Sequence, residues 1–395
     1  MDEAETSVAA TAAGAVSTQS AAQLRAEFRK LLTQQSRVNR ARDFVLDVTF
    51  EAAPGFTILF GASGAGKTTL LDCVAGLSTP DSGSISTSSR VLFDSSQRIN
   101  LPVARRHVGY VLQDLALFPH LTAAQNVAFG LTHLSQSART ERTAAMLDSF
   151  RILHLADRRP PEISGGEAQR VALARTLVTN PEVLLLDEPL AALDAPTKSQ
   201  IIDDMREWNR EHNVPILYVT HSRDEVFALG ERVIVLDGGR IVAHGTPHEV
   251  MMAPMQETVA QLAGFENVFD AEVQAVRPER GTMTCRIAGE GGAVFLETPL
   301  VRGGAGSALR VGIRAGDILL ATSPPIGLSA RNVIPGRIVS LTQRDVIVST
   351  QVKARVTMEV HLTLAARDSL QLEAGKEVWL VIKTHSCHLM RPPER

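Results

Sequence analysis

Short apolar runs without polar alternation recur along the first two thirds of the chain, at residues 56–60, 108–112, 183–186 and 216–220. Runs of this kind are typical of strands that are buried on both faces of a parallel sheet. After the first run, Leu70, Leu71, Val74 and Leu77 recur at the spacing of a helix that buries one face. The pattern therefore predicts an α/β domain.

From about Glu266 the pattern changes to short β-rich runs separated by glycine and proline, at residues 311–313, 318–320, 337–339 and 378–382. Runs of this length between turn residues predict an all-β domain of small barrels over 265–395. A weak internal repeat is also present, since residues 267–273 resemble 332–338 and residues 311–314 resemble 380–383. Two related units, about 265–322 and 323–395, fit this repeat. Chance similarity among short β strings is the alternative.

The first 36 residues form an extension that we expect to be disordered or partly helical. Residues 1–22 are rich in Ala, Ser and Thr and lack the basic start and apolar core of a signal peptide. Further on, Leu24, Phe28, Leu31 and Leu32 recur at helical spacing in a basic stretch that runs to Arg42. This spacing predicts a short amphipathic helix, and its small apolar face favours a solvated helix over a membrane anchor.

Composition limits the classes of protein that fit. A chain of 395 residues suggests two or three domains. The net charge of -3 gives no reason to expect a nucleic-acid partner. The three cysteines are far apart, which indicates neither a disulfide framework nor a zinc site and favours a reducing, cytoplasmic setting. No apolar run approaches the roughly 20 residues that span a bilayer.

A glycine-rich segment directly behind the first apolar run matches the pattern G-x-x-x-x-G-K-[ST]. Its glycines let successive backbone N–H groups point at phosphates, and the helix that follows directs its positive end at them. Lys67 is then expected to reach the β- and γ-phosphates, and Thr68 to bind Mg²⁺. A chance glycine turn is disfavoured, because a strand pattern precedes the motif and a helix pattern follows it. The expected nucleotide-binding residues here are Gly61, Ala62, Ser63, Gly64, Ala65, Gly66, Lys67, Thr68 and Thr69.

The apolar run 183–186 ends in Asp187 and Glu188. Ligands of open α/β sheets bind at the carboxyl ends of the strands, so both carboxylates are expected beside the phosphates. Asp187 is expected to hold Mg²⁺, and Glu188 to polarise the attacking water. A strand that ends in Asp-Glu is a weak signal alone, but it gains strength from the phosphate-binding segment.

Between these motifs, residues 163–170 resemble the signature sequence of ABC-family ATPases, and a helical pattern follows. The resemblance implies that Ser164, Gly165, Gly166 and Gln169 bind the γ-phosphate of an ATP held by a partner subunit. An ordinary helix cap is the alternative for this segment alone.

Further elements follow in the order that the family requires, and the resemblance covers about 46–264. It implies that Gln113 senses Mg²⁺ and the transmembrane partner, that Asp194 lies at the dimer interface, and that His221 contacts the γ-phosphate. The expected ABC ATPase domain spans 37–264, with a helical subdomain at about 114–170. The family's adenine-stacking aromatic has no clear match, since Phe44 and Phe50 are equally explained as core residues.

The resemblance also implies partners. Its split site requires ATP and Mg²⁺ in a homodimer of ATPase subunits. Residues 114–122 resemble importers, which implies permease subunits in the membrane, an external substrate-binding protein, and a position on the cytoplasmic face of the inner membrane. Leu117 and Phe118 are as well explained by core packing as by permease contact.

In the second β unit, residues 328–332 and 382–386 resemble elements of small molybdate-binding domains. Hydroxyls, amides and cations suit a tetrahedral oxyanion, so Ser329, the Ala330 amide, Arg331 and Lys383 are expected to form such a site. The alternative is that they only stabilise the barrel. The predicted function is the ATPase subunit of a molybdate or tungstate importer. Importers of sulfate, polyamine, iron or sugar, a soluble ABC ATPase, and an oxyanion-responsive regulator are the alternatives.

Overall fold

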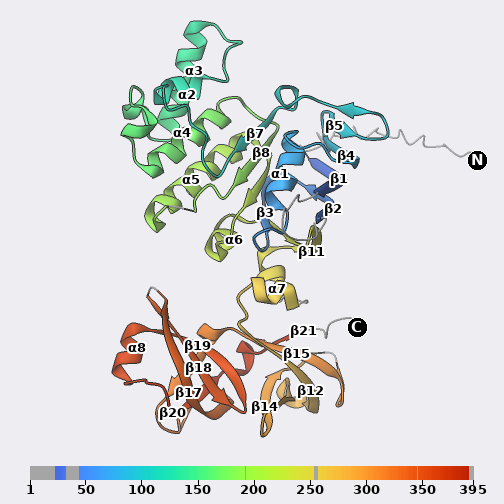
Figure 1. The fold of residues 1–395 in the computed structure, drawn as a ribbon, viewed down its shortest axis with the longest axis vertical. Coiled ribbons are helices and arrows are strands. Elements are labelled where there is room, and N and C mark those ends of the chain that lie inside the picture. Colours follow the sequence, from blue (N-terminus) through green and yellow to red (C-terminus); the bar gives the residue numbers. More distant parts are fainter. Residues whose placement is uncertain are drawn as a thin grey trace, which may run out of the picture.

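The computed structural model describes residues 23–32, 44–191, 193–252, 257–301, 303–344 and 346–390. The chain folds into an α/β part and a β part, with helix α7 (Glu257–Leu262) between them (Figure 1). The tail expected over residues 1–22 lies outside the described residues.

The α/β part is built on one sheet with strand order β6-β5-β4-β1-β2-β11-β10-β3-β9-β8-β7. Its parallel half holds the apolar runs of the sequence, and the strands pair in parallel from β10 to β7. These strands are β3 (Gly55–Phe60), β7 (Val108–Val111), β8 (Val183–Asp187), β9 (Pro215–Val219) and β10 (Arg232–Asp237). The runs thus predicted β3, β7, β8 and β9 correctly, whereas β10 was not among them.

Each central strand supplies side chains to two hydrophobic cores, one on each face of the sheet. In β3, Ile58 and Phe60 belong to one core and Leu59 to the other, and all three are nearly inaccessible to solvent. Helix α1 (Lys67–Ala75) packs in the second core, whereas α4 (Gly165–Leu177) and α5 (Ala195–His212) pack in the first. Burial on both faces explains why these strands lack polar alternation.

The helix predicted from Leu24 to Arg42 is wrong for Leu24–Leu32, which form strand β1; residues 33–43 lie outside the described residues. Buried and exposed side chains alternate along β1, and Ala26 fills the buried position between Leu24 and Phe28. The strand pairs with β2 and β4 and therefore belongs to the sheet of the α/β part. The remaining strands of the sheet pair antiparallel except at the contact of β2 with β11, which is parallel. They are β2 (Phe44–Ala52), β4 (Ser82–Thr87), β5 (Val91–Asp94), β6 (Ile99–Asn100) and β11 (Arg240–Gly245).

The helical subdomain lies at the top of the view in Figure 1. It holds α2 (Ala123–Ala128) and α3 (Gln136–Ser149), and α2 packs on α4. Helix α6 (Arg223–Leu229) follows β9, so it begins at the same edge of the sheet as α1.

The β part holds two five-stranded sheets, β14-β13-β12-β15-β21 and β19-β18-β17-β20-β16. Read in these directions, each strand of one unit has its counterpart in the other, and the last strand of each unit completes the sheet of the other. The first unit contains β12 (Asn267–Arg277), β13 (Thr282–Gly289), β14 (Gly292–Pro299), β15 (Ala308–Ile313) and β16 (Ile318–Ala321). The second contains β17 (Asn332–Arg344), β18 (Ile347–Ala354), β19 (Val356–Thr363), helix α8 (Leu364–Ser369), β20 (Glu377–Ile382) and β21 (His388–Met390).

A buried asparagine begins the first long strand of each unit and binds the backbone of the other unit. Asn267 donates to the carbonyl of Glu359 and accepts from its N–H, at 2.8 and 2.7 Å. Asn332 makes the same pair of bonds to Glu297, at 2.9 and 2.7 Å. The weak repeat in the sequence therefore corresponds to equivalent strands that are fastened reciprocally.

Candidate functional site

The glycine-rich segment forms the loop between β3 and α1. Gly64 and Gly66 have φ values of 80° and 103°, in the left-handed region that favours glycine. A Cβ on Gly66 would lie 3.0 Å from the ring of Phe44, so the loop also passes close to this aromatic side chain. Ala62, Ser63 and Gly64 are exposed, which leaves the loop backbone open to a ligand.

Lys67 is buried within this loop, with 6% of its surface exposed. Its Nζ donates to the carbonyls of Gly61 and Ala62, both at 2.9 Å. Burial lowers the pKa of Lys67, and the charges of Glu188 and Asp187 oppose that shift. The ammonium group is thus held at the loop and beside both carboxylates that the sequence singled out.

Thr68 and Asp187 meet across the sheet edge, where the Thr68 hydroxyl donates to Asp187 Oδ2 at 2.8 Å. Burial raises the pKa of Asp187, and the hydrogen bond from Thr68 partly offsets that rise. One hydroxyl and one carboxylate fit Mg²⁺, which usually takes one or two carboxylates together with phosphates and waters. No cluster of three or more acidic, His or Cys side chains that could hold a metal occurs in the described part of the chain.

Glu188 and His221 form the second contact at this edge, with His221 Nε2 lying 2.5 Å from Glu188 Oε1. Glu188 has a φ of 49°, unusual for a residue with a side chain, and its N–H donates to Val219 at the end of β9. The carboxylate is 20% exposed and the imidazole 44% exposed, so both reach solvent at the loop.

Gln113 is exposed and follows the end of β7, which neighbours β8. Leu115 and Ala116, which follow after Asp114, both have positive φ. Arg175 of α4 donates to their carbonyls at 2.7 and 2.6 Å and thereby holds this turn. Sequence reasoning did not identify Arg175 as part of the site; its only signal was an arginine on the helix after the signature.

Ser164 caps helix α4, and its N–H and hydroxyl donate to Glu167 at 2.7 and 2.8 Å. A Cβ on Gly165 would meet no atom within 4 Å, so this glycine faces open space. Gln169 differs from the rest of the signature because it is 4% exposed. Its Nε2 has no hydrogen-bond partner among the described residues, and its side chain does not share the open surface of Gly165.

Asp194 caps α5 by accepting from the N–H of Thr197 at 3.3 Å, and hydrogen bonds to Thr197 lower its pKa. A Cβ on Gly166 would lie 2.9 Å from the methyl of Thr197. The signature and the Asp194 turn are therefore neighbours within one chain.

A buried carboxylate that no motif indicated lies next to the loop between β9 and α6 that carries His221, called the histidine loop below. Glu225 is 4% exposed and accepts hydrogen bonds from Tyr218 at 2.9 Å, Thr220 at 2.7 Å and Lys198 at 3.1 Å. Through Lys198 it connects the loop before α6 to the first turn of α5.

The oxyanion candidates of the second β unit lie at one end of neighbouring strands. Asn332 at the start of β17 is opposite Ile382 at the end of β20, so Arg331 and Lys383 are brought to the same edge. Ser329, Arg331 and Lys383 are exposed, and Ala330 is half-buried.

No helix in the described part of the chain is long and apolar enough to span a membrane. Residues 45–191 match the family model described as ABC transporter, and residues 328–389 match the TOBE domain.

Curated relatives match over most of their length. The chain is 39% identical to a "Molybdenum import ATP-binding protein ModC" of Paramagnetospirillum magneticum, over 87% of this chain and 94% of the relative. It is 38% identical to the protein of the same name from Mesorhizobium japonicum, over 88% and 94%. It is 36% identical to a "Molybdate/tungstate import ATP-binding protein WtpC" of Pyrococcus abyssi, over 87% and 94%.

Proposed function

Because this chain belongs to the molybdenum import ATP-binding proteins of the ABC transporter family, we propose that it hydrolyses ATP to drive molybdate or tungstate import. The observation that carries the enzymatic part is the edge of the sheet where Thr68 contacts Asp187 and Glu188 contacts His221. This arrangement supports the proposal, because the glycine-rich loop, Thr68, Asp187 and Glu188 lie together at one end of parallel strands, where phosphates and a metal ion can bind.

Each residue at this edge has a proposed task in ATP hydrolysis. The loop amides and Lys67 bind the phosphates, and Thr68 and Asp187 hold Mg²⁺ with Gln113 nearby. When bound, Mg²⁺ neutralises phosphate charge. Glu188 orients and deprotonates the attacking water. His221 holds the Glu188 carboxylate in place and contacts the γ-phosphate.

The signature segment is proposed to act on the ATP of a second copy of the chain. Gly165 faces open space, and the Ser164 N–H and hydroxyl lie at the start of a 13-residue helix. Two chains joined through two ATP molecules would pair this surface with the partner's loop, and Asp194 would lie beside it. Gln169 contributes from the buried side by packing.

Replacing Glu188 by Gln tests the enzymatic proposal. The variant should bind ATP as the unmodified chain does, while kcat falls by at least about 100-fold because the base is lost. Glu182→Gln, at the opposite end of the same strand and paired with Arg90, is the matched control and should retain kcat. Unchanged turnover in the Glu188→Gln variant would mean that Glu188 is not the base.

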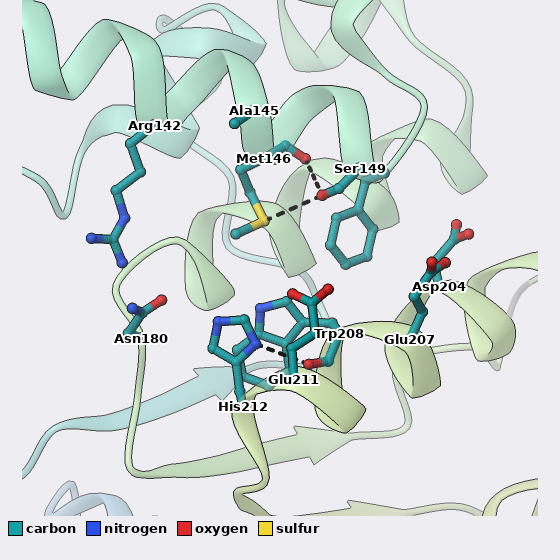
Figure 2. Close-up of a pocket in the computed structure, with 11 residues that line it drawn as sticks. Arg142, Ala145, Met146, Ser149, Asn180, Asp204, Glu207, Trp208, Glu211 and His212 are labelled. Carbon is teal, nitrogen blue, oxygen red and sulfur yellow. Dashed lines mark hydrogen bonds between the residues drawn. The ribbon is translucent and has the colours of Figure 1, made fainter.

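The permease is proposed to contact the groove between α3 and α5, a hollow of about 430 Å³ (Figure 2). Met146 lies on one wall, Trp208 and His212 stack on the other at 4.1 Å, and Trp208 Nε1 is buried without a hydrogen-bond partner in the described structure. The groove joins the helical subdomain to the core, so an occupant can move one against the other. A helix with an apolar face and a hydrogen-bond acceptor for Trp208 fits it.

A charge placed in the groove tests this contact. Met146→Glu should abolish the stimulation of ATPase activity by the permease and leave the activity of the isolated chain unchanged. Val103→Glu, at an exposed apolar position of the same domain, is the control. Normal stimulation of the Met146→Glu complex would exclude the groove.

The second β unit is proposed to bind the transported oxyanion and report its cytoplasmic level. The first unit supports this proposal, because there the Glu266 carboxylate accepts from the N–H of Ala315 at 2.8 Å. Glu266 precedes Asn267 as Arg331 precedes Asn332, and Ala315 corresponds to Thr384. The second unit therefore has the cationic Arg331 at the position where the first unit has the Glu266 carboxylate. The positions of Ser329, Ala330 and Lys383 lie around Arg331.

The assembled importer is proposed to sit on the cytoplasmic face of the inner membrane as a homodimer beneath the permease subunits. An external substrate-binding protein would deliver the oxyanion from the other side. The family name of the relatives supports this arrangement.

A further inference from the structure

Arg223 begins helix α6, two positions after His221. Its Nη1 donates to the carbonyl of Ala263 at 2.8 Å, just beyond the end of α7. The guanidinium also lies directly over Gly264, where a Cβ would be 2.2 Å from Nη1. The first turn of α6 is thus tied to the segment that leaves the ATPase domain.

That segment is the joint between the two parts of the molecule, which we define as residues 263–266 with Arg314 and His388. Phe265 is 1% exposed, with the Arg314 guanidinium 4.5 Å from its ring centre and the His388 ring edge-on at 4.7 Å. Arg314 also donates to the carbonyl of Met251 in the ATPase part, at 2.8 Å. The first β unit is therefore fastened rigidly to the residues that Arg223 contacts.

We propose that Arg223 is a positioning residue for His221, through which the joint sets the distance between the histidine loop and the nucleotide site. A shift of the first β unit moves Ala263 and Gly264, and the hydrogen-bonded Arg223 guanidinium transmits that shift to the first turn of α6. His221 has to stay within reach of Glu188, so small displacements of its loop change turnover.

The proposal rests on the role proposed for His221, and it separates two kinetic effects. The phosphate-binding loop lies between β3 and α1, and among the described residues the hydrogen bond of Arg223 goes to Ala263, so most phosphate contacts are independent of the link and ATP binding should change little. Loss of the link acts on the chemical step, and therefore on kcat and not on KM.

The test compares substitutions in the full-length chain by steady-state ATPase kinetics. Arg223→Met keeps the length of the stem and removes the donor; kcat should fall about 10-fold with KM for ATP unchanged. Arg223→Lys retains a cationic donor and should recover most of kcat. Arg210→Met, the same change at an exposed arginine of α5, is the control and should match the unmodified chain.

A double-mutant cycle distinguishes positioning from a general structural effect. Gly264→Ala displaces the guanidinium and, at a φ of 75°, also strains the backbone. It should therefore lower kcat in the unmodified chain by a clearly larger factor than when Arg223→Met is already present. Unchanged kcat in Arg223→Met, or multiplying effects of the two substitutions, would overturn the proposal. His221→Ala is measured in parallel. If this variant turns over normally, the role proposed for His221 is wrong. If His221→Ala loses activity while Arg223→Met keeps normal kcat, only the link through Arg223 is refuted.

Discussion

The first β unit, β12 to β16, and the second, β17 to β21, have the same strand order, yet the edge next to their starting asparagines serves different purposes. In the first unit, Glu266 fills the edge with its own carboxylate and Arg314 reaches into the ATPase part. In the second unit, the equivalent residues are Arg331 and Lys383, and both are exposed. In the first unit this edge is therefore occupied by contacts within the chain, whereas in the second unit two cationic side chains are open to solvent.

The largest expected effect comes from making the second unit resemble the first. Arg331→Glu places a carboxylate where Glu266 lies in the other unit, so it should repel an oxyanion and occupy the edge itself. Tungstate affinity of the full-length chain, measured by calorimetry, should fall by about 100-fold or more. Arg337→Glu, at an exposed position of the same strand, should leave the affinity unchanged. Undiminished binding by Arg331→Glu would place the anion site elsewhere.

Asn267 and Asn332, which bind the backbone of the opposite unit, test how alike the two units are. Asn332→Ala and Asn267→Ala should each lower the free energy of unfolding by about 3 kcal/mol, because each leaves a partly buried N–H and a carbonyl of the opposite unit without their asparagine partners. Urea unfolding of the full chain, followed by fluorescence, measures both. If one substitution lowers the free energy of unfolding by less than about 1 kcal/mol, that asparagine does not hold the units together.

Loosening the joint should have a smaller effect. Glu266→Gln retains the shape of the side chain but removes the charge, so its bond to the Ala315 N–H weakens by about 1 kcal/mol. Hydrogen exchange at residues 314–317 should become faster, while exchange at the equivalent residues 383–386 stays unchanged. Equal acceleration in both units would mean that Glu266 does not act locally.

The smallest expected effect concerns the pH dependence of stability and strand β21, which belongs to the second unit but completes the sheet of the first. Burial and the Arg314 charge lower the pKa of His388, which packs on Phe265, whereas its counterpart Leu319 is exposed. The unfolded chain therefore takes up a proton near pH 6.5 that the folded chain resists, so stability decreases as pH falls below that value. His388→Gln should remove this part of the pH dependence in urea titrations between pH 7 and 5.5. An identical slope in the variant would assign the dependence to other groups.

Local sequence determined much of the nucleotide site. The loop 61–68, Asp187 and Glu188 were predicted because each lies directly at the end of an apolar run, and parallel strands bring such ends together. Strand β1 was missed because Leu24 and Phe28 satisfy both a helical and an alternating spacing, and only pairing with β2 and β4 decides between them.

Contacts between distant segments could not be predicted in this way. Arg175 holds the turn after Gln113 from 59 residues away, and Arg223 reaches Ala263 across 40 residues. Glu266 was an unremarkable acid until its position was compared with that of Arg331. Such residues carry no local motif, because their partners are defined only by how the sheets and helices pack.

The ATPase rate of the complete importer tests the central claim most directly. The chain would be reconstituted in proteoliposomes with its permease and binding protein, and molybdate, tungstate and sulfate would be titrated on each side of the membrane. The account predicts stimulation by molybdate or tungstate on the side of the binding protein and inhibition by the same anions on the ATPase side. Stimulation by sulfate alone, or by none of the three anions, would contradict the assignment of molybdate as cargo.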